Sequence, residues 1–189
     1  FRAMRDRYLA LPVEEIANDP AVRKMGMRMF ANNCAQCHGA DAKGSFGFPN
    51  LADGDWIYGG SPADIRTSIT EGRHAAMPPW GGVIGEQGVT DVTAYILSIN
   101  GREADATRVA AGAQVFQTYC VACHGAEAAG NPVMGAPNLK DGIWLYGGSA
   151  EQISHSVRAG RNGVMPAHKE LLGEDKIHIL AAYVYGLNQ

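Results

Sequence analysis

The sequence has little that would place it in a membrane or on a nucleic acid. It contains no run of about 18 consecutive apolar residues, the length that a membrane-spanning helix needs. It also lacks a strong charge of either sign, because 16 Lys and Arg residues stand against 19 Asp and Glu residues. A nucleic-acid-binding domain is usually strongly basic, so that class is excluded. The chain begins at Phe1 without a signal peptide, and we expect a processed or excised soluble protein.

Cysteine is scarce as well, and all four cysteines lie in two short motifs, Cys34-Ala-Gln-Cys37-His38 and Cys120-Val-Ala-Cys123-His124. Cys-x-x-Cys-His is the attachment signature of c-type haem. Positions i, i+3 and i+4 share one face of a helical turn, so two thiols can bond to one porphyrin while the histidine binds its iron. The motifs predict two haem c groups with His38 and His124 as iron ligands. Because covalent haem attachment takes place outside the bacterial cytoplasm, they also predict a periplasmic protein.

Zinc binding, thiol redox chemistry and disulfide formation each fit the two motifs less well than haem attachment. A zinc site would need a second pair of ligands near each first pair, and the sequence provides none. A thioredoxin-like redox pair is expected in a βαβ context, which the sequence does not suggest. A structural disulfide within each motif would leave His38 and His124 without a role.

The chain is an internal repeat. The segments that lead to Cys34 and Cys120 align at an offset of 86 residues, and the offset is 88 from the two Pro-Asn-Leu segments onward. We therefore expect an N-terminal extension over 1–18, one cytochrome c domain over 19–100 and a second over 101–189. Helix-start signals at Asp19-Pro20, Ser61-Pro62 and Thr90-Asp91 predict three helices in the first repeat. The second repeat has the same scheme and no segment alternates like a strand, so the predicted fold class is all-α.

Two methionines are the leading candidates for the second axial position of the irons. Met77-Pro78 and Met165-Pro166 occupy equivalent places, 39 and 41 residues after His38 and His124. A thioether ligand favours reduced iron and raises its potential into the range of an electron carrier. Methionine is also a common core filler, but the equivalence across the repeats favours ligation. Met134 and the unmatched His74, His155, His168 and His178 are expected to be packing or surface residues.

Four further residues are candidates for the haem surroundings. Trp56 and Trp144 could donate an indole N–H to a haem propionate, although plain core packing is an equal alternative. Arg73 and Arg161 could pair with propionates, and the alternative is a solvated charge at a helix end.

The repeated motifs resemble tandem class I cytochrome c domains, and most closely the dihaem subunit, subunit III, of cbb3-type cytochrome c oxidases. The resemblance covers nearly the whole chain from about residue 8. The residues that carry it are Pro12–Asp19, Asn33–Gly39, Phe48–Leu51, Ala75–Pro78 with Trp80-Gly81, Met134–Leu139 and Lys176–Gly186. In that family both haems are His/Met-ligated and the domains are periplasmic. An N-terminal transmembrane anchor precedes them, and this sequence lacks it, so we expect the excised soluble part.

The resemblance also implies a function and partners. A small soluble donor cytochrome would deliver electrons, which would pass between the two haems to the monohaem and catalytic subunits of the oxidase. The chain itself would carry no catalytic residue. A free-standing periplasmic dihaem carrier is the first alternative, and a dihaem peroxidase or dehydrogenase subunit is a second. The paired Met-Pro motifs speak against an enzyme, which needs an open iron position.

Overall fold

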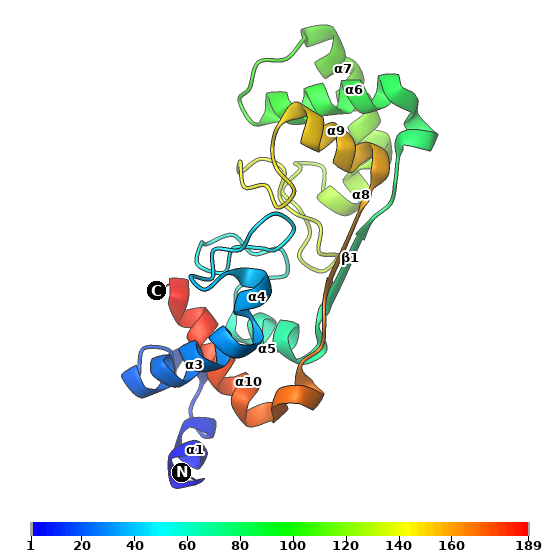
Figure 1. The fold of residues 1–189 in the computed structure, drawn as a ribbon. Helices are drawn as coiled ribbons and strands as arrows, with labels where there is room; N and C mark the ends of the chain where they lie inside the picture. The colour runs from blue at the N-terminus through cyan, green and yellow to red at the C-terminus, as the bar shows by residue number, and fades with distance from the viewer. Residues whose placement is uncertain (1, 189) are drawn as a thin grey trace. The chain divides into compact units, whose positions relative to one another are not determined.

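The computed structural model describes residues 2–188 (Figure 1). Phe1 and Gln189, the outer ends of the predicted extension and of the predicted second domain, lie outside the described residues. The elements of the first half are α1 (Arg2–Leu9), α2 (Val13–Ile16), α3 (Pro20–Asn33), α4 (Ala35–His38), α5 (Pro62–Glu71), β1 (Arg73–Met77) and α6 (Gly81–Ile99). Those of the second half are α7 (Ala106–Tyr119), α8 (Val121–His124), α9 (Ala150–Ala159), β2 (Arg161–Met165), α10 (Lys169–Tyr185) and a 3₁₀ turn, η1 (Gly186–Asn188).

The chain forms two compact units that cut across the two repeats. The first unit consists of Phe1–Arg73 with Val164–Gln189, and the second of His74–Gly163. Helix α10 of the second repeat packs against α3 and α5 of the first, whereas α6 of the first repeat packs against α7 and α9 of the second (Figure 1). The boundaries 19–100 and 101–189 therefore describe the repeats in the sequence, while each compact unit takes its last helix from the other repeat.

Side-chain caps fix several helix starts at the predicted places. The Asp19 carboxylate accepts hydrogen bonds from the backbone N–H groups of Ala21 and Val22, at 2.8 and 3.3 Å. Ser61 and Asp64 form a reciprocal capping box at the start of α5, and Ser149 with Gln152 forms the same box at the start of α9. These contacts satisfy N–H groups that the first helical turn leaves without partners.

Two features of the fold differ from the predictions. The last helices begin nine residues before Thr90 in α6 and at Lys169 in α10, and each is interrupted at a glycine with positive φ, Gly85 or Gly173. In addition, β1 and β2 pair in a two-stranded sheet, so the all-α expectation is right for the helices and incomplete for the fold. Each strand has alternating burial but no β-branched or aromatic run, and its partner lies 88 positions away in the sequence. Local propensity therefore could not reveal the pairing.

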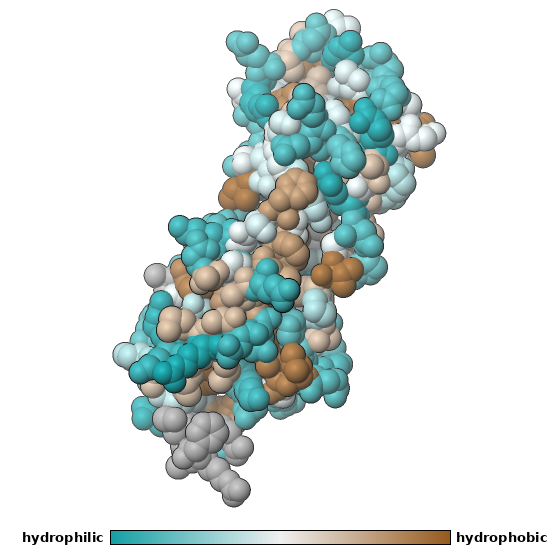
Figure 2. All heavy atoms as spheres, viewed as in Figure 1, coloured by the Kyte–Doolittle hydropathy of each residue, from teal (hydrophilic) through white to brown (hydrophobic). Residues whose placement is uncertain are grey.

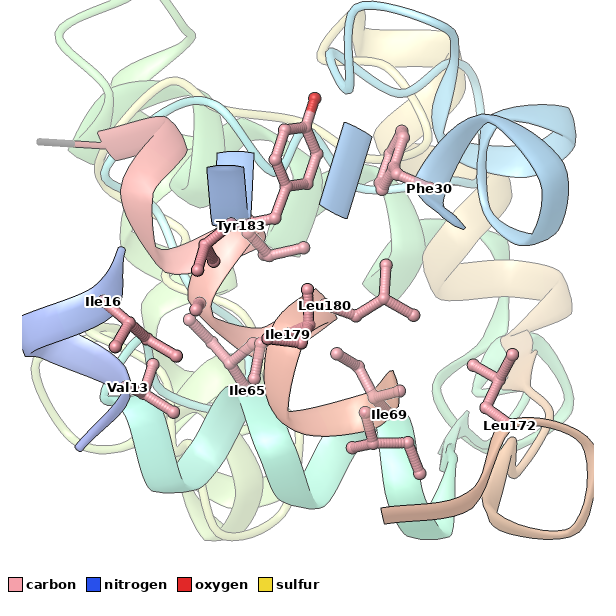
Figure 3. Close-up of a cluster of buried hydrophobic side chains, with 14 of the residues drawn as sticks. Val13, Ile16, Phe30, Ile65, Ile69, Leu172, Ile179, Leu180 and Tyr183 are labelled. Atoms are coloured by element: carbon pink, nitrogen blue, oxygen red, sulfur yellow. The ribbon is translucent and has the colours of Figure 1, made fainter. Parts of the chain in front are cut away.

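The core of the first unit lies between α2, α3, α5 and α10. Figure 3 shows Val13 and Ile16 of α2 directed toward the same interior as side chains of α5 and α10. Tyr8, Val13 and Ile16 are buried there, so these residues of the predicted 1–18 extension contribute to the core. Burial of each large aliphatic side chain contributes roughly 1.5–3 kcal/mol. The second unit has its own core, formed by Val89, Val92, Ile96, Phe116, Ala128, Ile153 and Val157.

In both units the helix that precedes the Cys-x-x-Cys-His motif crosses the last helix of the other repeat at a glycine. Gly26 of α3 lies against the Tyr183 side chain of α10, and Gly112 of α7 lies against the backbone of Asp91 in α6. Next to each crossing an aromatic pair fills the interface: the Phe30 and Tyr183 rings are 5.6 Å apart, and the Tyr95 and Phe116 rings 5.2 Å. The glycines allow an approach that any side chain would prevent.

We expect Gly26→Ala to destabilise the protein by about 3 kcal/mol, because an added Cβ would overlap Tyr183, whose Cγ would lie at 2.8 Å. Gly82→Ala in α6 is the matched control, since a Cβ there meets nothing within 4 Å and alanine favours a helix. Urea unfolding of both variants provides the measurement. Equal free energies of unfolding for the two variants would show that α3 and α10 can move apart without loss of stability.

Candidate haem sites

Each Cys-x-x-Cys-His motif occupies a single helical turn, α4 or α8, directly after the first helix of its repeat. The backbone N–H of His38 bonds to the Cys34 carbonyl at 2.9 Å, and that of His124 to the Cys120 carbonyl at the same distance. The two thiols and the imidazole of each motif therefore start from one turn, as the spacing predicts. This is the geometry that covalent attachment and axial ligation of one porphyrin require.

The two histidines are held in the same tautomer. Nδ1 of His38 lies 3.0 Å from the carbonyl oxygen of Pro49, and Nδ1 of His124 lies 3.0 Å from that of Pro137. A carbonyl can only accept, so Nδ1 carries the proton and Nε2 keeps a free lone pair for a metal. Burial lowers the pKa of both imidazoles, against the opposing effect of the proline carbonyls. Both side chains are therefore kept in the neutral form that binds iron.

Cys34 and Cys120 lack the lowered pKa of redox-active thiols. Burial, with a smaller effect of the neighbouring cysteine, raises the pKa of Cys34 to about 11 and that of Cys120 to about 11. Reactive thiols of the thioredoxin type have lowered pKa values, and all four cysteines here are free rather than in disulfides. Within residues 2–188, no three or more His, Cys, Asp or Glu side chains gather as a metal-ion site. The geometry thus favours neither the thioredoxin-like, the disulfide nor the zinc alternative.

The two candidate methionines lie in exchanged positions. Met165 is half-buried and borders the core of the first unit, together with Cys34 and Trp56. Met77 borders the core of the second unit, together with Cys120 and Trp144. Each motif therefore shares its unit with the methionine of the other repeat. The sequence identifies both methionines as candidates, but their order along the chain pairs each with the histidine of its own repeat. In the structure, each lies in the unit of the other histidine.

The candidate arginines are fixed in the same way in both units. The Arg73 guanidinium stacks on the Tyr58 ring at 4.6 Å, and its Nε donates to Ser68 Oγ at 2.9 Å. The Arg161 guanidinium lies 4.4 Å from the Tyr146 ring centre. These contacts hold the cations in place, unlike a freely solvated charge at a helix end. The two tyrosines were not expected to be supporting platforms, although both belong to the matched Tyr-Gly-Gly-Ser segments.

The candidate tryptophans are also equivalent. Trp56 packs over Gly60 in the first unit, and Trp144 packs over Gly148 in the second. Both indoles are half-buried at the border of a core that a cysteine of the motif also borders. Core packing is thereby established for each, and donation to a propionate stays a prediction.

Two buried polar atoms in the first unit could pair with a bound group. Among the described residues, Tyr58 Oη and His168 Nδ1 are buried and have no hydrogen-bond partner. Such atoms cost free energy unless a partner is supplied, and both lie in the unit of His38. His168 is also close enough to contribute to the lowered pKa of His38. The unit of His38 therefore has two buried polar atoms that a group with polar edges, such as haem, could pair with.

Two of the remaining candidate side chains have structural roles or face outward. His178 is buried, and its Nε2 lies 3.1 Å from the carbonyl oxygen of Leu11, which ties α10 to the N-terminal segment. Met134 is 52% exposed, and packing against the second haem stays a prediction for it. In the view of Figure 2, hydrophilic side chains cover most of the visible surface and apolar ones occur in small groups.

The chain matches one protein family over most of its length. A family model described as cytochrome c oxidase, cbb3-type, subunit III matches residues 21–96 and again 107–184. The chain therefore belongs to the family of subunit III of cbb3-type cytochrome c oxidases. It has two copies of the family's domain, which confirms the predicted repeat.

Individual relatives are also named as subunits of cbb3-type cytochrome c oxidases. The chain is 41% identical over 97% of its length to the cbb3-type cytochrome c oxidase subunit CcoP of Rubrivivax gelatinosus, covering 60% of that protein. It is 41% identical to the CcoP subunit of Rhodobacter capsulatus, with 98% and 70% covered. It is 40% identical to the subunit FixP of Sinorhizobium medicae, with 93% and 65% covered. The chain thus spans about 60 to 70% of the length of these relatives.

The membrane prediction can be compared with the helices of the structure. Over the described part of the chain, no helix is both long and apolar enough to cross a bilayer.

Proposed function

We propose that the protein transfers electrons through two covalently bound c-type haems. Cys34 and Cys37 would hold one haem and Cys120 and Cys123 the other, with His38 and His124 as proximal ligands. The observation that carries this proposal is the repeated motif turn in which Nδ1 of the histidine is bonded to a proline carbonyl and Nε2 is left for iron. Tyr58 Oη and His168 Nδ1 would find partners at the edge of the first haem.

The distal ligands in this proposal are exchanged between the repeats. The haem of the first unit would have His38 and Met165 as ligands, and that of the second unit His124 and Met77. Support comes from the packing of each methionine against the core that also borders the cysteine of that unit. A thioether in each distal position would leave no open site for an added ligand.

The residues around each site would keep an electron carrier rigid. When bound, haem iron supplies the one-electron redox change. The proline carbonyl fixes the imidazole plane through Nδ1, and the strand before Pro78 or Pro166 presents the methionine sulfur. The packed cores exclude water from one side of each site, while Arg73 and Arg161 provide fixed positive charges for propionates. These roles need no acid, base or nucleophile from the chain.

We place the chain as the electron-entry subunit of a cbb3-type oxidase. A small soluble cytochrome would donate, and the monohaem and catalytic subunits would accept, in the periplasm. This part of the proposal rests on the relatives, which are oxidase subunits by name. Co-purification of the full-length protein with an oxygen-reducing complex tests it. A full-length protein found only free of any oxidase would support the free-standing carrier instead.

We expect the matured protein to have the mass of the chain plus two haems, because each motif can hold one porphyrin. The double variant Cys34→Ser/Cys37→Ser should lose one of them. Intact-protein mass spectrometry provides the measurement, and recovery of bare chain from a strain competent for haem attachment would contradict the proposal.

We expect carbon monoxide to bind the reduced protein slowly and to less than roughly a tenth of the haem, since a methionine occupies each distal position. Visible absorption difference spectra provide the measurement. Rapid stoichiometric binding would favour a peroxidase or dehydrogenase subunit over a carrier.

A further inference from the structure

Helices α6 and α10 could each pack against either of two similar helices, α3 or α7. The two helices align at an offset of 88, with Tyr95 equivalent to Tyr183, and α3 aligns with α7 at an offset of 86, with Phe30 equivalent to Phe116. The crossing glycines and the aromatic pairs are therefore the same in both units. These contacts would form equally well if each helix packed within its own repeat, so they cannot determine the exchange.

One pair of equivalent positions differs in chemistry. Asp91 of α6 is 7% exposed and accepts hydrogen bonds from Arg108 Nη1 of α7 at 3.3 Å and from Gln87 Nε2 at 2.8 Å. The carboxylate is the buried member of the ion pair, because the Arg108 side chain is 45% exposed. The residues at the equivalent positions of the other unit are Ile179 of α10 and Val22 of α3, which are 7% and 0% exposed in one apolar core. One interface thus contains an ion pair at positions where the other has two apolar side chains.

Packing within each repeat would separate these partners. The Asp91 carboxylate would be placed against Val22, and the Arg108 guanidinium against Ile179. A buried carboxylate that loses its cation is strongly destabilising, whereas the observed arrangement keeps the charges together and the apolar groups together. We propose that the Asp91–Arg108 pair determines which helix α6 packs against, and so specifies the helix exchange between the repeats.

A surface ion pair favours the same exchange. Lys169 of α10 bonds to Glu71 of α5 at 2.8 Å within the first unit. The residue equivalent to Lys169 is Gly81 and that equivalent to Glu71 is Ala159, so same-repeat packing would leave both charges unpaired. Both side chains are about half exposed, and this pair is therefore weaker than the one at Asp91.

Moving the carboxylate from α6 to α10 tests the proposal. In the variant Asp91→Ile/Ile179→Asp, the carboxylate can reach Arg108 only if α10 packs against α7 of its own repeat. We expect the exchange to be reversed. The matched control Asp91→Arg/Arg108→Asp reverses the charges but keeps the pair across α6 and α7, and should retain the exchange.

Nuclear Overhauser contacts between aromatic rings report the packing directly in the matured, reduced protein. The wild type and the control should show a Tyr95–Phe116 contact. The Asp91→Ile/Ile179→Asp variant should lose it and gain a Tyr95–Phe30 contact. Retention of the Tyr95–Phe116 contact alone in this variant would overturn the proposal.

A second variant decides the matter if the first does not fold. Asp91→Ile/Arg108→Val makes both interfaces apolar and leaves no unpaired buried charge. Without the ion pair, we expect both the Tyr95–Phe116 and the Tyr95–Phe30 contacts, from a mixture of exchanged and unexchanged molecules or from exchange between chains. A single population with only the Tyr95–Phe116 contact would show that the exchange is specified elsewhere.

Discussion

Replacing Met165 with alanine is expected to change the haem that we propose at Cys34 and Cys37, although Met165 belongs to the other sequence repeat. The methionine borders the core that contains the Cys34 motif, whereas Met77 borders the core with Cys120. Loss of a thioether ligand should lower the potential of that haem on the order of 0.1–0.3 V, a fraction of the roughly 0.8 V range that axial ligands control. It should also open the iron to carbon monoxide.

Single-haem backgrounds assign the effect to one site. With Cys120→Ser/Cys123→Ser, only the haem at Cys34 and Cys37 remains, and Met165→Ala should change its potential and spectrum while Met77→Ala should not. Met134→Ala, at an exposed position of the second unit, is the control that should leave the remaining haem unchanged. Sensitivity of the remaining haem to Met77→Ala would instead indicate that each repeat supplies both of its own ligands.

The variant with all four motif cysteines changed to serine is expected to lose most of its α-helical circular dichroism. Each compact unit is small, and small domains bury too little apolar surface for comfortable stability. Half-buried side chains such as Trp56 and Met165 border the cores without being enclosed, so a porphyrin would complete them. The residues between α4 and α5 also lack helices of their own.

Far-UV spectra of the matured protein and of the serine variant provide the measurement. The Gly82→Ala control should keep the full signal, since its added methyl group meets open space. If the haem-free chain kept its native ellipticity, its helices would be stable without the porphyrin. The porphyrin could then no longer be regarded as part of the core.

Much of the site could be predicted from local patterns. The Cys-x-x-Cys-His turns and the caps at Asp19, Ser61 and Ser149 are encoded within a few residues, and the structure places them as expected. The equivalent arginines and tryptophans were found because the repeat matches them in pairs. Such features depend on neighbours in the sequence, which composition and spacing describe well.

The exchange of the last helices could not be predicted in this way. Both packing arrangements would bury the same stripe, with Tyr95 and Tyr183 opposite a phenylalanine in either case. The strands β1 and β2 were missed for a similar reason, since their hydrogen-bonding partner is distant in the sequence. The two arrangements differ at positions where the repeats are unequal, such as Asp91 and Ile179 or Lys169 and Gly81. The effect of such a residue depends on the helix that it packs against, which a local pattern does not reveal.

The exchanged helices also change what the stretch between the repeats can do. Residues 100–105 connect α6 to α7, two helices that already pack against each other in one unit. A protease that cleaves there would not liberate two independent cytochromes. Helix α6 of the N-terminal fragment would still complete the second unit, and helix α10 of the C-terminal fragment would complete the first. The cleaved molecule would therefore stay together without a covalent link. Truncation of either fragment at its last helix would leave the unit of the other fragment incomplete.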